Sequence, residues 1–219
     1  MGGWTEFVAA FVVFFASHRL LVMAPVKRPL VRILGAGGFT FAYSAMSALV
    51  LTWIIIAAGR APYVELWPRQ AWMNHVTLTL MALASVIFAM ALGRPNPLSF
   101  GGLHDERFDP RHPGLIGWMR HPLLVVLGLW SSGHLLANGD LAHAIMFGSF
   151  VVFAIVGTRI IDRRKRRLLG AEQWARLAAT RRTFEPSLNG LVRISLGLAL
   201  YGALLWLHGP VIGVDPLAF

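Results

Sequence analysis

The chain has 219 residues, of which 56% are hydrophobic and 14% charged, with a formal net charge of +10 and a mean hydropathy of +0.62. A soluble domain carries about 25% charged residues, so this composition indicates a membrane protein and excludes an ordinary soluble one. Because the chain contains no cysteine, disulfides, thiolate ligands and iron–sulfur clusters are excluded, and histidine is the main soft metal ligand left.

Six apolar segments follow one another along the chain and predict six transmembrane helices. A helix needs about 20 apolar residues to cross the hydrocarbon core of a bilayer. The segments cover residues 4–23, 33–59, 70–93, 122–139, 141–158 and 194–214. We therefore expect an all-α, multi-pass fold in a single membrane domain over residues 1–219. Asn138-Gly139-Asp140 is a turn signal, which predicts an antiparallel hairpin of the fourth and fifth helices.

The basic residues lie in alternate loops and predict the orientation of the helices. They follow the first, third and fifth segments, with the densest run at Arg163 to Arg167. The other loops carry only Arg60 and Arg69, and neither terminus is basic. Since basic loops stay in the cytoplasm, we expect both termini outside. No stacking aromatics alternate with these charges, so we expect a lipid bilayer as partner and no nucleic acid.

The basic loop after the fifth segment allows two interpretations. Leu168, Leu169, Trp174 and Leu177 fall on one helical stripe among arginines, which is typical of an amphipathic helix on an anionic lipid surface. The alternative is that the charges only set topology, and we favour this simpler interpretation.

Two histidines lie inside apolar segments and are the candidate metal ligands. His18 occurs in FVVFFASHRLLVM, and His134 occurs in RHPLLVVLGLWSSGHLLANGD. An ionisable ring in a membrane helix is costly, so it usually faces protein, water or a cofactor. One possibility is that each makes an interhelical hydrogen bond worth roughly 1 kcal/mol. The other is that the two imidazoles bind a haem iron from opposite sides.

The depth of the two rings permits a shared haem without requiring it. With the fourth helix starting at Pro122, His18 and His134 differ in depth by roughly 10 Å, which a tilted haem accommodates. A start near Leu115 raises the offset to about 20 Å and excludes the pair. His121 is then the alternative second ligand, because its depth is closer to that of His18.

The tripeptide Arg120-His121-Pro122 is the second candidate site. It lies where the fourth helix begins, and unpaired backbone N–H groups at a helix N-terminus attract anions together with nearby cations. We expect Arg120 and His121 to bind a haem propionate or a lipid phosphate. The alternative is a basic cap that holds the helix at the interface.

The chain resembles the NnrU family of bacterial membrane proteins and, more distantly, the plant and cyanobacterial 15-cis-zeta-carotene isomerases. The resemblance covers nearly the whole chain and is carried by these blocks in order: the region of His18, FAYSAMSALVL, APYVELW, RPNPLSFGGL, RHPLLVVLGLWSSGHLLANGD and IDRRKRRLLG. The block from Arg120 to Asp140 is the most specific.

The resemblance implies a location in a bacterial inner membrane and a function in or beside denitrification, with respiratory nitrite or nitric oxide reductase components as partners. The isomerase relatives use haem b with redox-dependent histidine ligation, which by motif gives His18 and His134 as ligands here. Those isomerases carry a cysteine where this chain has Ser131, so exchange to a sulfur ligand is impossible. Whether the protein is an enzyme stays open, and a cis-trans isomerase of a carotenoid or lipid and a non-catalytic assembly factor are alternatives.

A fainter resemblance links the chain to isoprenylcysteine carboxyl methyltransferase-like membrane enzymes. It is carried by Arg-His-Pro at 120–122, by LLGAEQWARL and by Phe184-Glu185-Pro186. The acidic pair expected before that tail is reduced to Asp162 followed by arginine. This leaves the methyltransferase as an analogy of fold.

Overall fold

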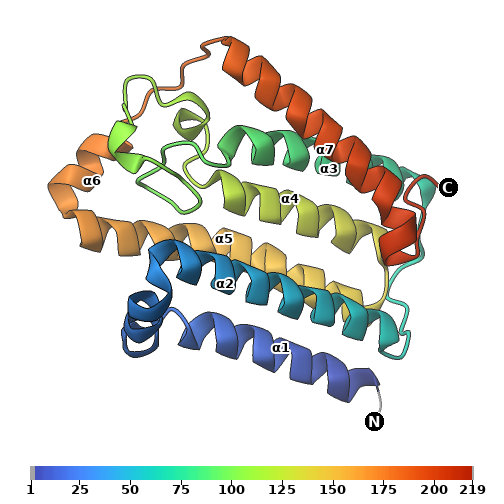
Figure 1. Ribbon diagram of the computed structural model, residues 1–219. Coiled ribbons are helices and arrows are strands. Elements are labelled where there is room, and N and C mark those ends of the chain that lie inside the picture. The colour runs from blue at the N-terminus through green and yellow to red at the C-terminus, as the bar shows by residue number, and fades with distance from the viewer. Residues whose placement is uncertain (1–2, 219) are drawn as a thin grey trace. The chain divides into compact units, whose positions relative to one another are not determined.

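The structure is a computed structural model that describes residues 3–218, and it is helical (Figure 1). The described residues contain one isolated β-bridge, between Glu65 and Asp140, and no longer strand. The all-α fold expected from the sequence is confirmed. The α-helices are α1 (Gly3–Leu20), α2 (Ala24–Arg60), α3 (Ala71–Ala91), α4 (Pro122–Ala137), α5 (Leu141–Leu169), α6 (Ala171–Ala178) and α7 (Leu188–Ile212), with the short 3-10 helices η1 (Asp105–Arg107) and η2 (Gly114–Gly117) between α3 and α4.

Each of the six predicted segments forms a helix, and four of these helices are long and apolar enough to cross a membrane. The four are α2, α3, α5 and α7. With 16 residues, α4 extends over about 24 Å, which is less than the hydrocarbon core of about 30 Å. The described residues thus contain four candidate spans, while the six-span count and the outside location of the termini stay predictions.

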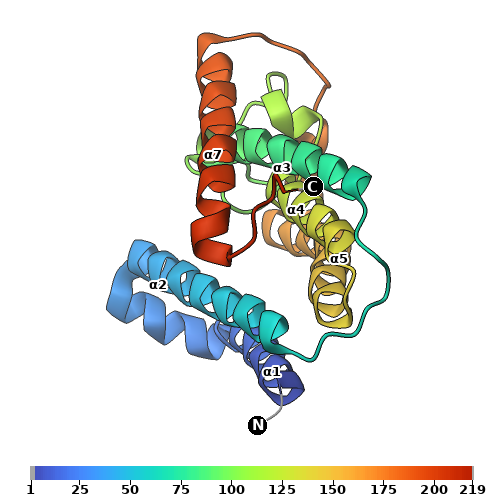
Figure 2. The same ribbon diagram turned by 90° about the vertical axis from the view of Figure 1, so that its right-hand side faces the viewer.

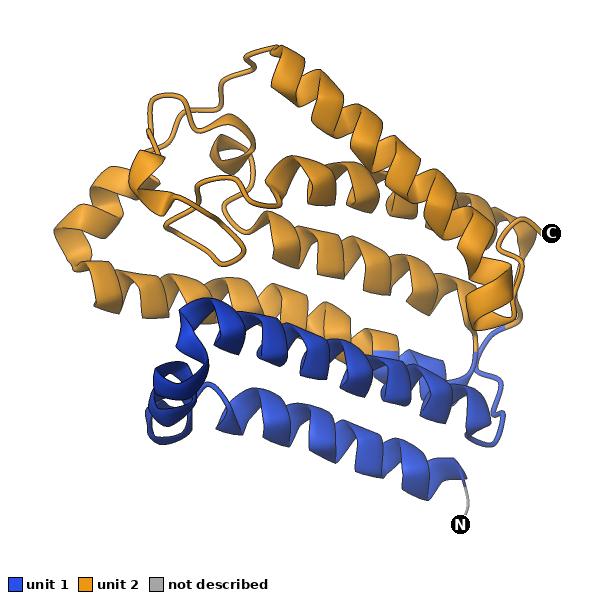
Figure 3. Cartoon of the chain, in the orientation of Figure 1, with its two compact units in different colours: residues 1–67, 140–146 blue, residues 68–139, 147–219 orange. Residues whose placement is uncertain are grey.

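The chain divides into two compact units (Figure 3). Unit 1 contains the chain up to Trp67 together with Asp140–Met146, and unit 2 contains Pro68–Gly139 and the chain from Phe147 onward. In unit 1, the backbone N–H of Leu141 donates to the carbonyl of Val64 at 2.9 Å. This bond joins the segment after α2 to the start of α5.

In unit 1, α1 packs against the second part of α2. The Glu6 carboxylate Oε1 accepts hydrogen bonds from Trp53 Nε1 at 3.3 Å and from Arg60 Nη1 at 3.2 Å. These bonds pair the beginning of α1 with the end of α2, so the two run antiparallel. Gly35 has φ 72° and ψ 168° and interrupts α2, because glycine adopts this backbone conformation at no steric cost.

The stretch before Gly35 is an additional helical segment that the sequence analysis did not expect. It begins at Ala24 and contains Pro25 in its first turn and Pro29 further along. The helix before it, α1, stops at Leu20. Proline is tolerated at the first turn because its missing N–H has no partner there in any residue.

In unit 2, α3 packs against α4 and against α7, and α5 returns antiparallel along α4 (Figures 1 and 2). Small residues allow these close contacts, as is common in membrane helices. A Cβ at Gly197 of α7 would lie 2.6 Å from the Cα of Val86 on α3. Across the other contact, the Thr77 hydroxyl of α3 donates to the carbonyl of Gly133 on α4 at 2.8 Å.

The loop between α3 and α4 is folded and partly buried in unit 2. Asn96 organises it: its backbone N–H donates to Asp105 Oδ1 at 2.8 Å, its Oδ1 accepts from the N–H of Leu98 at 3.2 Å, and its Nδ2 donates to the carbonyl of Arg120 at 3.0 Å. Asn96, Leu98 and Ser99 are buried. The loop therefore holds the beginning of α4 in place.

Candidate functional site

The polar centre of unit 2 is formed by Arg120 and His121 at the start of α4, Ser99 of the preceding loop and Asp162 of α5. Arg120 Nη1 donates to Asp162 Oδ2 at 2.7 Å, and His121 Nε2 lies 3.1 Å from Asp162 Oδ1. The Ser99 hydroxyl lies 3.0 Å from His121 Nδ1. The side chain of His121 is only 7% exposed. One carboxylate thus binds both residues that the sequence analysis selected.

The hydrogen bonds of His121 define its tautomer. A carboxylate accepts only, so Nε2 carries the proton and Nδ1 accepts from the Ser99 hydroxyl. Burial lowers the pKa of His121, because desolvation penalises the imidazolium more than Asp162 stabilises it, and the charge of Arg120 acts in the same direction as burial. His121 is therefore neutral at pH 7. Both ring nitrogens of His121 are engaged by side chains, so His121 is poorly placed to be a metal ligand.

Trp174 of α6 covers this centre. The guanidinium carbon of Arg120 lies 5.1 Å from the centroid of the Trp174 ring, and that of Arg166 lies 5.8 Å from it, within the range of cation–π attraction. The indole Nε1 is buried and has no hydrogen-bond partner among the residues that the structure describes. Leu168 and Leu169 belong to α5, not to the short α6 that carries Trp174 and Leu177, so the expected stripe is divided between two helices.

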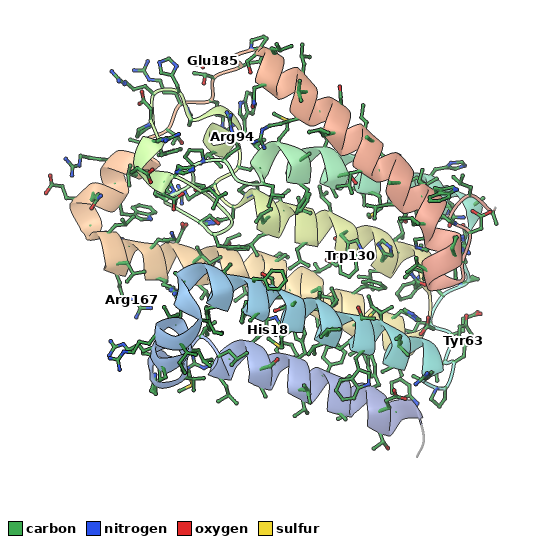
Figure 4. All side chains as sticks on the ribbon, in the orientation of Figure 1. His18, Tyr63, Arg94, Trp130, Arg167 and Glu185 are labelled. Atoms are coloured by element: carbon green, nitrogen blue, oxygen red, sulfur yellow. The ribbon has the colours of Figure 1, made fainter. Side chains whose placement is uncertain are left out.

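His134 lies near the other end of α4 from His121, about 20 Å further along the helix axis. Its Nδ1 lies 2.8 Å from the carbonyl of Trp130. The centroid of its ring lies 5.3 Å from that of Trp130, 5.2 Å from that of Phe147 and 6.4 Å from that of His208 on α7. Figure 4 labels Trp130 on α4, one turn before His134. His134 is therefore surrounded largely by aromatic rings.

His18 lies in unit 1, on the side of α1 that faces α2 (Figure 4). Its Nδ1 lies 2.8 Å from the carbonyl of Phe14. The centroid of its ring lies 4.1 Å from that of Phe14 and 5.6 Å from that of Tyr43 on α2. The setting resembles that of His134 in having aromatic neighbours and a carbonyl four residues earlier.

The two embedded histidines have the same tautomer. A carbonyl oxygen accepts only, so Nδ1 of each neutral ring carries the proton and Nε2 carries the lone pair. A metal-bound histidine in proteins usually donates its second ring N–H to such an acceptor, which fixes the ring and raises ligand basicity. Among residues 3–218, no group of three or more His, Asp or Glu side chains is placed to hold a metal ion by itself.

Three members of these sites were not predicted from the sequence: Ser99, Asp162 and His208. Ser99 and Asp162 are 22 and 41 residues from His121, so no local spacing indicates them. Asp162 does stand out as a lone acid before a run of arginines. His208 is the third: its ring lies beside His134, and its Nδ1 lies 2.7 Å from the carbonyl of Val214.

The comparisons with known proteins agree with the resemblance drawn from the sequence blocks. No curated protein and no solved structure gives a significant match to the chain. The family model described as NnrU protein matches residues 6–216, and this range includes His18, Arg120, His121 and His134. Because the match covers nearly the whole chain, the protein belongs to the NnrU family.

Proposed function

We propose that this protein is a haem b-binding membrane protein that acts in or beside nitrogen-oxide respiration, with His18 and His134 as the two axial ligands. The observation that carries the proposal is the shared tautomer of the two rings. In each, Nδ1 donates to a carbonyl of its own helix at 2.8 Å, so Nε2 is the nitrogen with a lone pair for iron. The proposal requires that Nε2 of His18 and Nε2 of His134 reach the same haem.

The neighbours of both histidines fit a haem. Phe14 and Tyr43 lie beside His18, and Trp130 and Phe147 lie beside His134. Aromatic side chains provide a large apolar surface for a flat macrocycle and keep water away from the ligand nitrogens. When bound, haem b would supply one-electron redox chemistry, and its iron would bind nitric oxide if one histidine were released on a change of redox state.

Ser131 favours histidine ligands, because it offers no sulfur in their place. Its side chain is fully buried, and its hydroxyl donates to the carbonyl of Leu127 at 2.6 Å. The position that carries a cysteine in the related isomerases is thus occupied here by a group that bonds to its own helix. We therefore place redox or sensing chemistry ahead of carotenoid isomerisation by ligand exchange.

Arg120 and His121 belong to the proposal as an anion-binding centre. Arg120 is paired with Asp162, so an incoming phosphate or propionate must share its guanidinium with that carboxylate. Arg166 and the buried Nε1 of Trp174 are further donors close to Arg120. An anion bound here would receive hydrogen bonds from groups of α4, α5 and α6.

The proposal is tested by purifying the protein from haem-replete cells and recording absorption spectra of the oxidised and reduced forms. We expect a Soret band and about one haem per chain. His18→Ala and His134→Ala are expected to lose haem or to shift the bands. The matched control is His75→Ala, in a histidine of α3 that the proposal does not use, and we expect it to keep the spectrum.

Three outcomes contradict the proposal at different levels. A colourless preparation favours a non-catalytic assembly factor. A coloured protein whose spectrum is unchanged in His18→Ala and altered in His208→Ala assigns the second ligand to His208. If the spectrum is unchanged in both His18→Ala and His134→Ala, neither histidine is a ligand of the haem iron.

A further inference from the structure

An apolar groove of about 390 Å³ lies between α3 and α7 in unit 2. Its walls are aliphatic or aromatic for most of their length, and Asn189 and Arg193 lie at one end. The apolar lining residues are Phe88, Ala89, Leu92, Val192, Leu196 and Leu200. Both helices are candidate membrane spans, so we expect the groove to face lipid hydrocarbon.

Two arginines meet at the polar end of this groove. Arg94 Nη1 donates to Asn189 Oδ1 at 3.2 Å, and Arg193 Nε donates to the same oxygen at 3.1 Å. Among residues 3–218, no carboxylate oxygen lies within 4.0 Å of either guanidinium. Two positive charges thus share one neutral amide oxygen, and the charge of the cluster is left uncompensated by protein.

Arg193 also has a structural task. Its Nη1 donates to the carbonyls of Ala89 and Leu92 at 2.8 and 2.9 Å. These carbonyls lie at the C-terminal end of α3, where a cation interacts favourably with the helix dipole. Arg94 donates no such bond to a helix carbonyl. A substitution of Arg94 therefore tests ligand binding with less effect on α3 than a substitution of Arg193.

A second cavity, of about 200 Å³, also has Arg94 in its lining. Arg94, Arg107 and His112 line it, and Figure 4 places Arg94 at the same end of unit 2 as Glu185. Its one acidic lining residue, Asp109, is bound by Arg111, whose Nε and Nη2 donate to the carboxylate at 3.2 Å each. This cavity therefore adds no negative charge that would neutralise Arg94.

We propose that the groove between α3 and α7 binds an anionic glycerophospholipid, with an acyl chain along the apolar walls and the phosphodiester at Arg94 and Arg193. Basic pockets between membrane helices on the cytoplasmic side bind anionic head groups, and the charge pattern predicts this side for Arg94. A free phosphate would use the arginines but not the apolar walls, and an apolar peptide would leave the arginines unpaired. The proposal does not depend on haem.

The test is native mass spectrometry of the delipidated, full-length protein titrated with phosphatidylglycerol and, separately, with phosphatidylcholine. We expect phosphatidylglycerol to bind more tightly than phosphatidylcholine. Arg94→Gln should weaken phosphatidylglycerol about tenfold, which corresponds to about 1.4 kcal/mol. Arg182→Gln removes an equally basic, exposed residue of the loop before α7 and should leave the affinity unchanged.

A second pair of variants tests the apolar wall independently of charge. Leu196→Trp fills the groove and should displace the lipid, whereas Leu198→Trp adds the same bulk on a different face of α7 and should not. Leu196 and Leu198 are 59% and 52% exposed, so neither variant overpacks a core. Equal binding of the two phospholipids, equal effects of the two tryptophans, or displacement by millimolar inorganic phosphate would each overturn the proposal.

Discussion

Nδ1 of His18 and Nδ1 of His134 are each bonded to a carbonyl of their own helix, and the two ring nitrogens of His121 are bonded to the side chains of Ser99 and Asp162. A ring that has Nδ1 fixed by its own backbone needs no second element to set its tautomer. His121 instead connects the loop of Ser99 to α5 through Asp162, and its burial makes it sensitive to pH.

The pH dependence of stability follows from the lowered pKa of His121. The unfolded chain binds a proton at this residue near pH 6.5, while the folded protein binds it only at lower pH. Stability is therefore lost as the pH falls below about 6.5. We expect the unfolding temperature in detergent to drop between pH 7 and pH 5, and to drop less in His121→Gln. An equal drop in both proteins would show that His121 does not contribute.

Trp174 offers a second test at the scale of one residue. Trp174→Ala removes the ring on which Arg120 and Arg166 lie and should cost about 1 kcal/mol of stability. Trp174→Phe keeps an aromatic ring and removes the buried, unpaired N–H, so without ligand it should be no less stable than the wild type. Thermal unfolding of the three proteins measures this. Equal losses in both variants would contradict the arrangement.

The sequence indicated Arg120 and His121 because a basic pair precedes a proline at the start of an apolar segment. It did not indicate Ser99 or His208, because the contacts of these residues join parts of the chain that are distant in sequence. The partner of a buried side chain depends on tertiary packing, which residue spacing does not encode.

At the scale of elements, glycines determine how closely α3 and α7 approach. A Cβ at Gly197 would lie 2.6 Å from the Cα of Val86, whereas a Cβ at Gly202 of the same helix meets no heavy atom within 4 Å. The six apolar segments were predicted as helices, since length and hydropathy suffice for that. The break at Gly35 and the separate α6 were not predicted, because each depends on a single glycine with positive φ, at residues 35 and 170.

Gly197 and Gly202 of α7 make a matched pair of variants. Gly197→Ala should separate α3 from α7 and cost about 1–3 kcal/mol through overpacking. Gly202→Ala should be neutral or stabilise by up to about 1 kcal/mol, because alanine favours a helix. Unfolding temperatures in one detergent compare them. If Gly197→Ala is as stable as Gly202→Ala, the close approach of the two helices is wrong.

At the scale of the whole molecule, loops predicted to lie on one side of the membrane contact each other within each unit. In unit 1, the segment around Glu65 pairs with Asp140, and both were predicted outside. In unit 2, Trp118 Nε1 donates to the carbonyl of Thr183 at 3.0 Å, and His112 Nδ1 lies 3.0 Å from Glu185 Oε1. These contacts join the two basic loops that were predicted inside, so the two loops lie on one side; which side of the membrane this is stays a prediction.

The absence of cysteine allows this orientation to be tested directly. Tyr63→Cys and Arg182→Cys each introduce a single thiol at an exposed loop position. A maleimide that cannot cross membranes should label Tyr63→Cys in intact spheroplasts and Arg182→Cys only after permeabilisation. Labelling of both before permeabilisation, or the reverse pattern, would contradict the assignment of the basic loops to the cytoplasm.

The central claim is that one haem iron is bound by His18 and His134, and the most direct measurement is electron paramagnetic resonance of the purified ferric protein. The account predicts a low-spin signal of two-histidine ligation that becomes high-spin, or disappears with the haem, in both His18→Ala and His134→Ala. A wild-type protein without haem, or a low-spin signal that survives in either variant, would contradict it.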